Sequence, residues 1–400
     1  MTGKLPRILW ITEHYPPGAG GMATSCARQV NGLRARGFAV DALVFEEAPE
    51  ASSEKASRST ARDGGIDIHI AAQSHPGTAA QVAWRRALER TAQAGPYSHI
   101  VGFGANWPGY IAVTFAKWLG AKSAVLVRGN DFDRDLFDPR RGFYVREALG
   151  HADATGAVSL DAARRISAQF PGCRAMWTPN GIDVSRYELL PGDIAARDEI
   201  RAKLSTGGRR IVGVFGELKF KKRIPFFLAA LRDAGLKDRA ALLVVGRIDE
   251  EARQLLADPA ISPAHKHIPF CAQDALPALY AACDYTALPS MFEGMPNVLL
   301  EAMAAGVVPI VSDAGAMANM VRDGHTGFVF RAEDRADAAR AAAKAFALTD
   351  AALEKMKIRA RKHVAKEFTP AKEIDALIEL LSCKRAAAPV KRSGAKSKNT

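Results

Sequence analysis

Residues 285–311 read YTALPSMFEGMPNVLLEAMAAGVVPIV, and the order of apolar and polar residues in this stretch decides the fold. The run Tyr285–Leu288 is short, apolar and rich in strand-forming residues, which predicts a buried strand. A helical pattern follows from Asn297, and Val307–Val311 predicts a second buried strand. A strand, a helix and a strand in this order form a βαβ unit, whose two strands are parallel.

The same alternation continues in both directions from this unit. In the second half of the chain, strands are predicted at Ile211–Phe215, Ala240–Val245 and His267–Phe270. In the first half, the predicted strands are Arg7–Thr12, Val40–Phe45, Ile66–Ala71, His99–Phe103, Ala124–Arg128 and Ala154–Ser159. The fold class is therefore α/β, with two doubly wound, Rossmann-like domains expected to face each other across a cleft. Ligands of such sheets bind beyond the carboxyl ends of the strands, so functional residues are expected directly after strands.

Breaks in the pattern predict the domain organisation. A Pro/Gly break at Leu189–Gly192 and the Ser-Thr-Gly-Gly sequence within Leu204–Arg209 place a boundary near residues 185–209. We expect one domain over residues 1–190 and a second over residues 191–382. Residues 350–381 predict two terminal helices, broken by Pro370, that cross back to the first domain. Residues 46–65 predict a surface loop, and residues 383–400 a disordered basic tail.

The composition excludes several classes of protein. At 48% apolar and 24% charged residues, the chain is typical of a globular protein with large cores. Its formal net charge is +12, and six cations, with no acid, lie in the tail from Lys384 onward. The field of the remaining chain is mild, which argues against nucleic-acid binding. The N-terminal apolar run ends at Glu13, too early for a secretory signal, so we expect a cytoplasmic protein with reduced cysteines.

Two glutamates flank the start of the helix in the opening stretch. Glu293 lies in the loop, Gly294 permits a close approach of the backbone, and Asn297 is expected to cap the helix, with Glu301 about one turn inside. A helix N-terminus binds anions, and carboxylates accept hydrogen bonds from the hydroxyl groups of a sugar or a ribose. The alternative is a plain loop-to-helix junction in which Glu301 only stabilises the helix start.

A cluster of cations follows the strand Ile211–Phe215. Lys219, Lys221, Lys222 and Arg223 crowd the start of the next predicted helix. Cations at a helix N-terminus oppose the helix dipole, at a cost of about 0.3–1 kcal/mol each. A solvated basic face is the ordinary explanation for such a run. The position directly after a strand instead favours binding of a diphosphate, and Lys222 is the best placed of the four.

A glycine-rich turn, EHYPPGAGGM over residues 13–22, follows the first predicted strand. Gly20 and Gly21 stand just before the next helix, where backbone N–H groups can face a phosphate. The turn does not have the G-x-G-x-x-G spacing of dinucleotide-binding proteins. Taken alone, it is better explained as a flexible turn, and only the other two segments favour a phosphate-binding role.

These segments together resemble the retaining glycosyltransferases of family 4, which are nucleotide-sugar enzymes of the GT-B fold. The resemblance extends to about residue 382. Its most specific mark is an E-x7-E segment with Glu293, Gly294, Asn297, Glu301, Ala302 and Gly306 in place. It is supported by the glycine turn, by the sequence PNGID at residues 179–183 and by Lys222, six residues after Gly216.

The resemblance implies a role for each matching residue. Glu293 would contact the donor sugar and Glu301 the ribose. Lys222, the amides of Asn297 and Val298, and the Gly20-Gly21 turn would hold the diphosphate. Catalytic roles would fall to Glu293, Lys222 and Arg128.

Two positions depart from the pattern of the family. Glu217 stands where many members have Arg, so Lys219 would supply the missing charge in donor binding. Arg128 stands where members often have a His near the reacting sugar carbon. The same region spells D-x-D at Asp131 and Asp133, a pattern that chelates a metal in a different glycosyltransferase fold. Because Lys222 and two N–H sites already offer compensating charge, we expect neither a metal nor another cofactor.

The function that the resemblance implies is transfer of a hexose-type sugar, with retention, from a nucleoside diphosphate sugar to an acceptor hydroxyl. The acceptor would be a glycan or a lipid-linked sugar, in cell-surface polysaccharide or glycolipid synthesis. Two alternatives stay open: a catalytically silent nucleotide-binding or scaffold protein, and another GT-B enzyme such as a sugar-nucleotide epimerase or a phosphorylase. The basic tail either holds the enzyme against the inner, anionic membrane face or is simply solvated.

Overall fold

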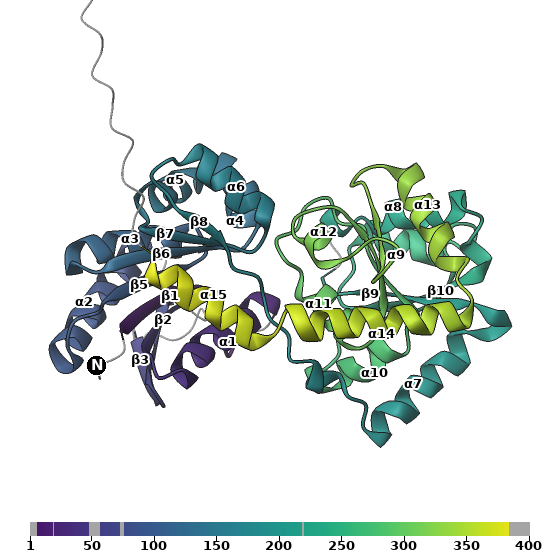
Figure 1. The fold of residues 1–400 in the computed structure, drawn as a ribbon, viewed down its shortest axis with the longest axis horizontal. Coiled ribbons are helices and arrows are strands. Elements are labelled where there is room, and N and C mark those ends of the chain that lie inside the picture. The colour runs from purple at the N-terminus through teal and green to yellow at the C-terminus, as the bar shows by residue number, and fades with distance from the viewer. Residues whose placement is uncertain (1–5, 19, 48–56, 73–75, 218–219, 384–400) are drawn as a thin grey trace, which may run out of the picture. The chain divides into compact units, whose positions relative to one another are not determined.

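The computed structural model describes residues 6–18, 20–47, 57–72, 76–217 and 220–383. Within these residues the chain forms two compact units (Figure 1). The first unit runs to Thr178 and resumes at Ala376, and the second unit is Pro179–Asp375. Lys219 and the basic tail from residue 384 onward lie outside the described residues.

The first unit is built on a sheet whose strand order, over the described residues, is β3-β4-β2-β1-β5-β6-β7-β8. Neighbouring strands are parallel except β3 and β4, which form an antiparallel pair. The order reverses between β1 and β5, and such a switch point is where doubly wound sheets bind ligands. The strands are β1 (Arg7–Thr12), β2 (Ala39–Glu47), β3 (Ser57–Arg62), β4 (Gly65–Ala72), β5 (His99–Phe103), β6 (Lys122–Val127), β7 (Ala154–Ala157) and β8 (Ala175–Trp177).

Two apolar clusters join the helices of the first unit to this sheet. One cluster packs α2 and α3 against β1, β2, β4 and β5, and the other packs α5 and α6 against β6 and β7. The helices are α1 (Gly21–Ala35), α2 (Pro76–Ala94), α3 (Trp107–Leu119), α4 (Asn130–Asp133), α5 (Gly142–His151) and α6 (Leu160–Gln169), with a 3₁₀ turn, η1, at Asp135–Phe137.

The second unit repeats the architecture with a parallel sheet in the order β11-β10-β9-β12-β13-β14. Its switch point lies between β9 and β12. The strands are β9 (Arg210–Phe215), β10 (Ala240–Val245), β11 (Ala264–Ile268), β12 (Tyr285–Leu288), β13 (Val308–Ser312) and β14 (Phe328–Phe330). One core cluster packs α8 and α13 against β9, β10, β12, β13 and β14, while α14 packs on α11 and α7 on α10.

The helices of the second unit lie before, between and after its strands along the chain. They are α7 (Pro191–Leu204), α8 (Ile224–Asp233), α9 (Glu250–Ala257), α10 (Leu276–Ala281), α11 (Asn297–Ala304), α12 (Met317–Met320), α13 (Arg335–Phe346) and α14 (Asp350–Glu367). Short 3₁₀ turns include η2 (Val184–Tyr187) and η4 (Phe220–Lys222). The opening stretch of the sequence is thus β12, α11 and β13, with β12 and β13 in parallel register.

Most predicted strands are present, but the region between β2 and β4 differs from the prediction. β1, β5, β10 and β12 have the predicted bounds, whereas β11 begins at Ala264 instead of His267. The predicted loop at residues 46–65 contains β3, which pairs with β4 in an antiparallel hairpin. Its sequence, SRSTAR, is almost wholly exposed at the sheet edge, so backbone pairing forms the strand without an apolar pattern. β8 and β14 were also missed, since three residues are too few to show a period.

The chain enters the second unit before the Pro/Gly break. Asn180 donates its Nδ2–H to the Met295 carbonyl at 3.1 Å, and the Gly181 amide donates to Glu373 at 3.0 Å. These contacts attach the segment after Thr178 to the second unit. Pro191 begins α7 within that unit, so the residues expected near a boundary form a helix there.

The last helix, α15 (Pro370–Ser382), belongs to both units. Its residues up to Asp375 count with the second unit and those from Ala376 with the first. In the first unit the Leu381 carbonyl lies 2.9 Å from His99 Nε2. The predicted pair of terminal helices, separated at Pro370, is therefore α14 and α15.

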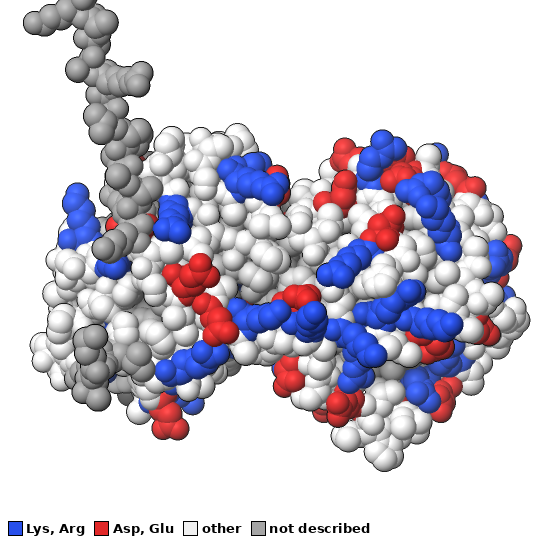
Figure 2. All heavy atoms as spheres, in the orientation of Figure 1, with Lys and Arg blue, Asp and Glu red and all other residues white. Residues whose placement is uncertain are grey.

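Basic side chains gather over α14 on the face shown in Figure 2. The acids Glu354 and Glu367 flank these cations in the sequence, and Lys357 lies 2.8 Å from Glu354 and 3.7 Å from the buried Asp284. The cations of α14 are Lys355, Lys357, Arg359, Arg361, Lys362 and Lys366. Within the described part of the chain, we find no helix with the length and apolar character needed to span a bilayer.

Candidate active site

A lysine and a glutamate from two loops meet at the switch point of the second sheet. Lys222 ends the 3₁₀ turn that follows β9, and Glu293 lies in the loop after β12. Lys222 Nζ donates to Glu293 Oε1, and Ser290 Oγ donates to the same oxygen at 3.2 Å. Lys221 Nζ lies 3.7 Å from the other carboxylate oxygen. The structure therefore brings together two predicted site residues that are distant in the sequence.

The Glu293 carboxylate is buried and ionised. Its side chain is 9% exposed and that of Lys222 13%. Burial alone would raise the pKa of Glu293, but the charges of Lys222 and Lys221, together with the hydrogen bonds it accepts, hold the pKa below its ordinary value. A ligand can replace either partner of such a pair. A phosphate can bind the ammonium group in place of the carboxylate, and a hydroxyl can bind the carboxylate in place of the ammonium group.

A glycine on the neighbouring loop fixes the backbone at Glu293. Gly315, after β13, has φ +59°, and a Cβ at this position would lie 1.8 Å from the Glu293 carbonyl oxygen. The Ala316 amide donates to the Gly294 carbonyl at 2.8 Å. Sequence reasoning missed Gly315. Its position in the sequence could have identified it. Gly315 comes three residues after Ser312, and the strand before it was predicted to neighbour the strand that precedes Glu293.

The N-terminus of α11 lies at the end of β9. Pro296 is the N-cap and Asn297 the first helical residue, so the prediction that Asn297 caps the helix is wrong. The Asn297 side-chain oxygen instead accepts a hydrogen bond from Asn180 at 3.1 Å. A Cβ on Gly216 would come within 3.7 Å of the Val298 side chain, which places this helix end beside the turn after β9. The positive end of the helix dipole thus points to the same turn as Lys222.

Glu301 is held by a tyrosine that the sequence did not single out. Tyr280 on α10 donates its hydroxyl to Glu301 Oε2 at 2.8 Å. The Tyr280 ring is buried and stacks on Phe215, with 4.0 Å between the ring centroids. Burial and the adjacent carboxylate raise the pKa of Tyr280 well above its ordinary value, so it acts as a neutral donor. The interaction fixes one carboxylate oxygen of Glu301.

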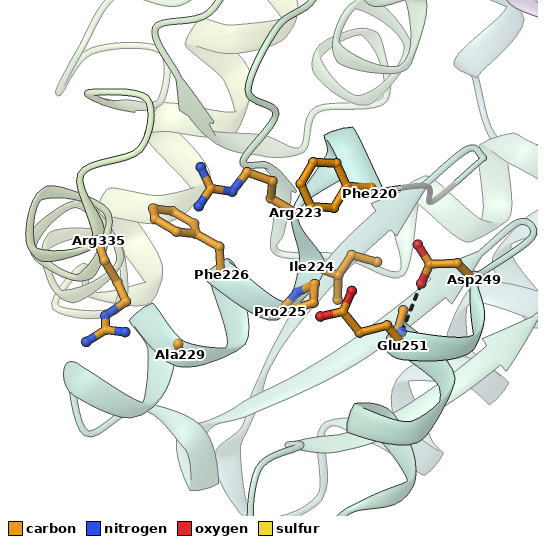
Figure 3. A pocket seen from close by; sticks show the side chains of 10 residues that line it. Phe220, Arg223, Ile224, Pro225, Phe226, Ala229, Asp249, Glu251 and Arg335 are labelled. Carbon is orange, nitrogen blue, oxygen red and sulfur yellow. Dashed lines mark hydrogen bonds between the residues drawn. The ribbon is translucent and has the colours of Figure 1, made fainter.

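A pocket of about 320 Å³ adjoins the lysine turn (Figure 3). Phe220 and Arg223 contribute to its wall, and Asp249 caps α9 there by accepting the Ala252 amide at 2.9 Å. Arg223 is the N-cap of α8 with φ 49°, and its guanidinium lies over the Phe226 ring. Of the predicted basic cluster, Lys221 and Lys222 therefore contact Glu293, whereas Arg223 contributes to this pocket. Glu217 is exposed.

The glycine turn of the first unit lies at the carboxyl end of β1. Gly20 is the N-cap of α1 with φ 107°, and Gly21 is the first helical residue. The Gly20 carbonyl accepts the Thr24 amide at 3.1 Å. A Cβ on Gly20 would meet no heavy atom within 4 Å, so the space over the turn is open within the described part of the chain. A helix N-terminus with open space before it is suited to an anion.

Arg128 lies at the carboxyl end of β6, close to the end of β5. It is buried, with its guanidinium carbon 4.7 Å from the centroid of the Phe103 ring. Its backbone amide donates to both Asp131 carboxylate oxygens, at 2.9 and 3.0 Å. Arg128, Gly20 and Gly21 thus follow strands of the same sheet, each at its carboxyl end.

Both acids of the D-x-D sequence have protein partners. Asp131 accepts the amides of Ala105, Arg128 and Gly129 at 2.7–3.0 Å and is buried. Asp133 pairs with Arg165 at 2.5 Å. Among the described residues no group of three His, Cys, Asp or Glu is arranged to hold a metal ion. The partners of the two side chains thus give each a structural role: Asp131 anchors backbone amides, and Asp133 forms a surface ion pair with Arg165.

Two doubly wound units, with cations and carboxylates after the strands of the second and a glycine turn after the first strand, define the class as a GT-B glycosyltransferase. A family model described as Glycosyltransferase Family 4 matches residues 19–186. A second model, described as Glycosyl transferases group 1, matches residues 196–363. The chain belongs to the family 4 glycosyltransferases, and it is an enzyme of that type.

Several known proteins are similar to this chain. The GDP-mannose-dependent alpha-(1-6)-phosphatidylinositol monomannoside mannosyltransferase of Mycobacterium tuberculosis is 28% identical over 344 residues, 81% of this chain and 85% of that protein. The D-inositol 3-phosphate glycosyltransferase of Nocardia farcinica is 30% identical over 277 residues, 65% of this chain and 58% of that protein.

The solved structures agree with the fold. Sucrose-phosphate synthase of Thermosynechococcus elongatus has a TM-score of 0.76 at 19% identity, covering 94% of this chain and 99% of that one. Anabaena HepE, solved with UDP and glucose, has a TM-score of 0.71 at 19% identity and the same coverage. At this identity the likeness shows the fold alone.

Proposed function

We propose that this enzyme transfers a hexose, with retention of configuration, from a nucleoside diphosphate sugar to an acceptor hydroxyl. The observation that carries the proposal is the buried Lys222–Glu293 pair beside the N-terminus of α11. It provides a cation, a helix dipole and an ionised carboxylate at one switch point. This combination suits a diphosphate attached to a sugar.

The residues have two kinds of role: some stabilise charge, and others position the donor. Lys222 and the first-turn amides of α11 stabilise the negative charge that develops on the leaving diphosphate. Glu293, released from Lys222, accepts hydrogen bonds from hydroxyls of the donor sugar and orients its reacting carbon. Glu301, held by Tyr280, binds the ribose. The leaving diphosphate oxygen takes the proton of the acceptor hydroxyl on the same face of the sugar.

In the first unit, the Gly20-Gly21 turn contributes amides to the diphosphate. Arg128, which follows β6, supplies a permanent positive charge near the reacting sugar carbon. An arginine cannot act as a base at neutral pH, so its role is electrostatic. The proposal includes no metal ion.

The acceptor is proposed to be a lipid-linked sugar, as in glycolipid synthesis. The relative from Mycobacterium tuberculosis carries the name of a mannosyltransferase that acts on a phosphatidylinositol monomannoside. That name makes GDP-mannose the first donor to test, with UDP-glucose second because Anabaena HepE was solved with it.

The test is a panel of nucleotide sugars, with release of nucleoside diphosphate measured with and without a glycolipid acceptor. The anomeric configuration of the product is then read by NMR. We expect release only with acceptor and a retained configuration. Release of nucleoside diphosphate without an acceptor, or a product of inverted configuration, would contradict the proposal.

A further inference from the structure

Two buried aromatic rings of the first unit lie on the sheet face that α1 covers. Trp10 stands in β1 between Leu9 and Ile11, which pack with α2 and α3 on the opposite face. Because neighbouring side chains of a strand point to opposite faces, Trp10 points to α1, where its indole N–H donates to the Cys26 thiol at 3.2 Å. Phe103 ends β5, and its ring centroid lies 6.0 Å from that of Trp10. The two rings thus join α1 to the end of β5.

The Arg128 side chain continues this row of contacts on the same face of the sheet. Phe103 pairs with Leu126 of β6, and Arg128 follows Leu126 by two residues. The guanidinium carbon of Arg128 lies 4.7 Å from the centroid of the Phe103 ring. The Phe103 ring is therefore fixed from behind by Trp10, whose N–H is itself bound to α1, and it presents its face to the guanidinium.

Stability alone does not account for an arginine at this position. Arg128 is buried, and removing a guanidinium from water costs free energy that an apolar side chain packed on Phe103 would not cost. Asp131 lies nearby, but burial raises the pKa of this acid, and its oxygens already accept three backbone amides. Stacking on an aromatic face offsets part of the cost and fixes the plane of the guanidinium. A buried cation that is held in one orientation suits a role in the reaction.

We propose that Phe103 is a positioning residue, whose ring holds the Arg128 guanidinium in place for sugar transfer. This inference rests on the proposed function, in which Arg128 supplies a positive charge near the reacting sugar carbon. Phe103 acts through Arg128 and not on the donor. A charge that is already oriented stabilises the transition state without reorganisation during the reaction, and a small displacement of such a group is costly. Loss of the ring face should therefore lower the rate of transfer even where the charge is kept.

The kinetic test compares Phe103→Leu with the matched control Phe115→Leu. Phe115 is a similarly buried phenylalanine of the cluster on the opposite face of the sheet. Phe103→Leu should lower kcat about tenfold with little change in KM for the donor. Phe115→Leu should lower the melting temperature by a similar amount and leave kcat unchanged. Arg128→Lys keeps the charge but loses the planar stack, so its kcat should fall at least as far as that of Phe103→Leu.

A double-mutant cycle shows whether Phe103 acts through Arg128. In the Arg128→Met background, Phe103→Leu should cause no further loss of kcat, because the group that the ring positions is absent. A second measurement requires neither donor nor turnover. The ring current of Phe103 should shift the Arg128 Nε–H resonance upfield in NMR spectra, where Arg128→Met assigns the resonance by its loss. This resonance should move downfield in Phe103→Leu and stay in place in Phe115→Leu.

The outcomes separate this inference from the proposed function on which it rests. Circular dichroism and thermal melts check that each variant folds. An absence of transfer by the unchanged chain would contradict the proposed function itself. Transfer by the unchanged chain, with a kcat that Phe103→Leu lowers equally with and without Arg128, would overturn the positioning role alone. An Arg128 resonance that does not move in Phe103→Leu would overturn the stack, and a full kcat in Arg128→Lys would show that its orientation does not matter.

Discussion

Two loops of this enzyme place a carboxylate just after a parallel strand, and the two carboxylates have different partners. Glu293, after β12, meets the side chains of Lys222, Lys221 and Ser290. Asp131, after β6, meets backbone amides. A ligand can replace a side-chain cation, but it cannot replace the amides that define a loop. The partner of an acid, more than its place in the fold, therefore distinguishes a binding group from a structural one.

The pKa shifts agree with this distinction. Burial raises the pKa of both acids, but at Glu293 the nearby ammonium groups outweigh burial and the pKa falls. At Asp131 burial outweighs the amides and the charge of Arg128, and the pKa rises. Of these two acids, Glu293 is the one whose pKa is lowered by neighbouring lysine ammonium groups.

The largest effect is expected at Lys222. Lys222→Ala should lower transfer by about a hundredfold or more, because it removes a charge that stabilises the leaving diphosphate. Glu293→Ala should be comparably damaging. Lys221→Ala, the matched control, removes a cation 3.7 Å from the same carboxylate and should cost much less. Steady-state kinetics with excess acceptor measure the three rates. Equal losses for both lysines would mean that only the summed charge matters.

Gly315→Ala should reduce transfer at least about tenfold and also lower stability. A Cβ 1.8 Å from the Glu293 carbonyl must displace that loop, and small displacements of positioning groups are costly. Gly324 has φ +69° and no heavy atom within 4 Å of such a Cβ, so Gly324→Ala isolates the backbone strain. This control should lose about 1 kcal/mol of stability and no activity. Kinetics and thermal melts on both variants make the comparison.

Asp131→Ala should destabilise the first unit by about 3 kcal/mol or more, because it leaves several buried amides without an acceptor. Asp133→Ala breaks a half-exposed pair with Arg165 and should cost about 1 kcal/mol or less. Chemical denaturation measures both. Assays with EDTA complete the experiment. If chelation stops turnover and Mn²⁺ or Mg²⁺ restores it, Asp131 and Asp133 bind a metal after all.

The Lys222–Glu293 pair also predicts a pH effect. The folded-state pKa of Glu293 lies below its ordinary value, so the stabilisation is present above that value and is lost as the pH falls through the folded pKa. In Lys222→Ala, burial persists with less compensating charge. The loss of stability at acid pH should therefore begin at a higher pH in this variant, and Lys221→Ala should shift it less. Melting temperatures across acid pH test this order; an unmoved limb would show that Lys222 does not set the charge of Glu293.

The smallest effect is expected at Tyr280. Tyr280→Phe removes the hydroxyl that holds Glu301 and should raise KM for the donor severalfold with kcat nearly unchanged. Tyr285→Phe removes a buried hydroxyl bonded to the Ala345 carbonyl, away from the E-x7-E segment. It should lower stability without changing KM. A matching KM change in both variants would indicate a general packing effect.

The sequence predicts the elements that carry strong periodic patterns. β1, β5, β10 and β12 are buried apolar runs, and their bounds follow directly from the residues. β3 was missed because an exposed edge strand has polar residues and is held by backbone pairing. The entry of Pro179 into the second unit depends on Glu373, distant in the chain, so no local pattern could show it.

For the candidate site, the residues that lie in a recognisable motif could be named from the sequence, but the residues that position them could not. Glu293, Lys222, Asn297 and Glu301 lie within motifs. Their roles in catalysis and donor binding, like those of Arg128 and the glycine turn, remain predictions. The residues that position them are Gly315, which lies close to the Glu293 backbone, and Tyr280, which donates a hydrogen bond to Glu301. Both contacts are visible only in the three-dimensional structure.

The passage of α15 into the first unit also sets an order for synthesis on the ribosome. Leu377, Leu380 and Leu381 are buried there, and Leu380 approaches Gly156 closely enough that a Cβ on the glycine would lie 3.0 Å away. The ribosome makes all of Pro179–Asp375 before it makes these leucines. The second unit can therefore fold while the first still has an open apolar flank, which makes the nascent first unit the part most in need of a chaperone.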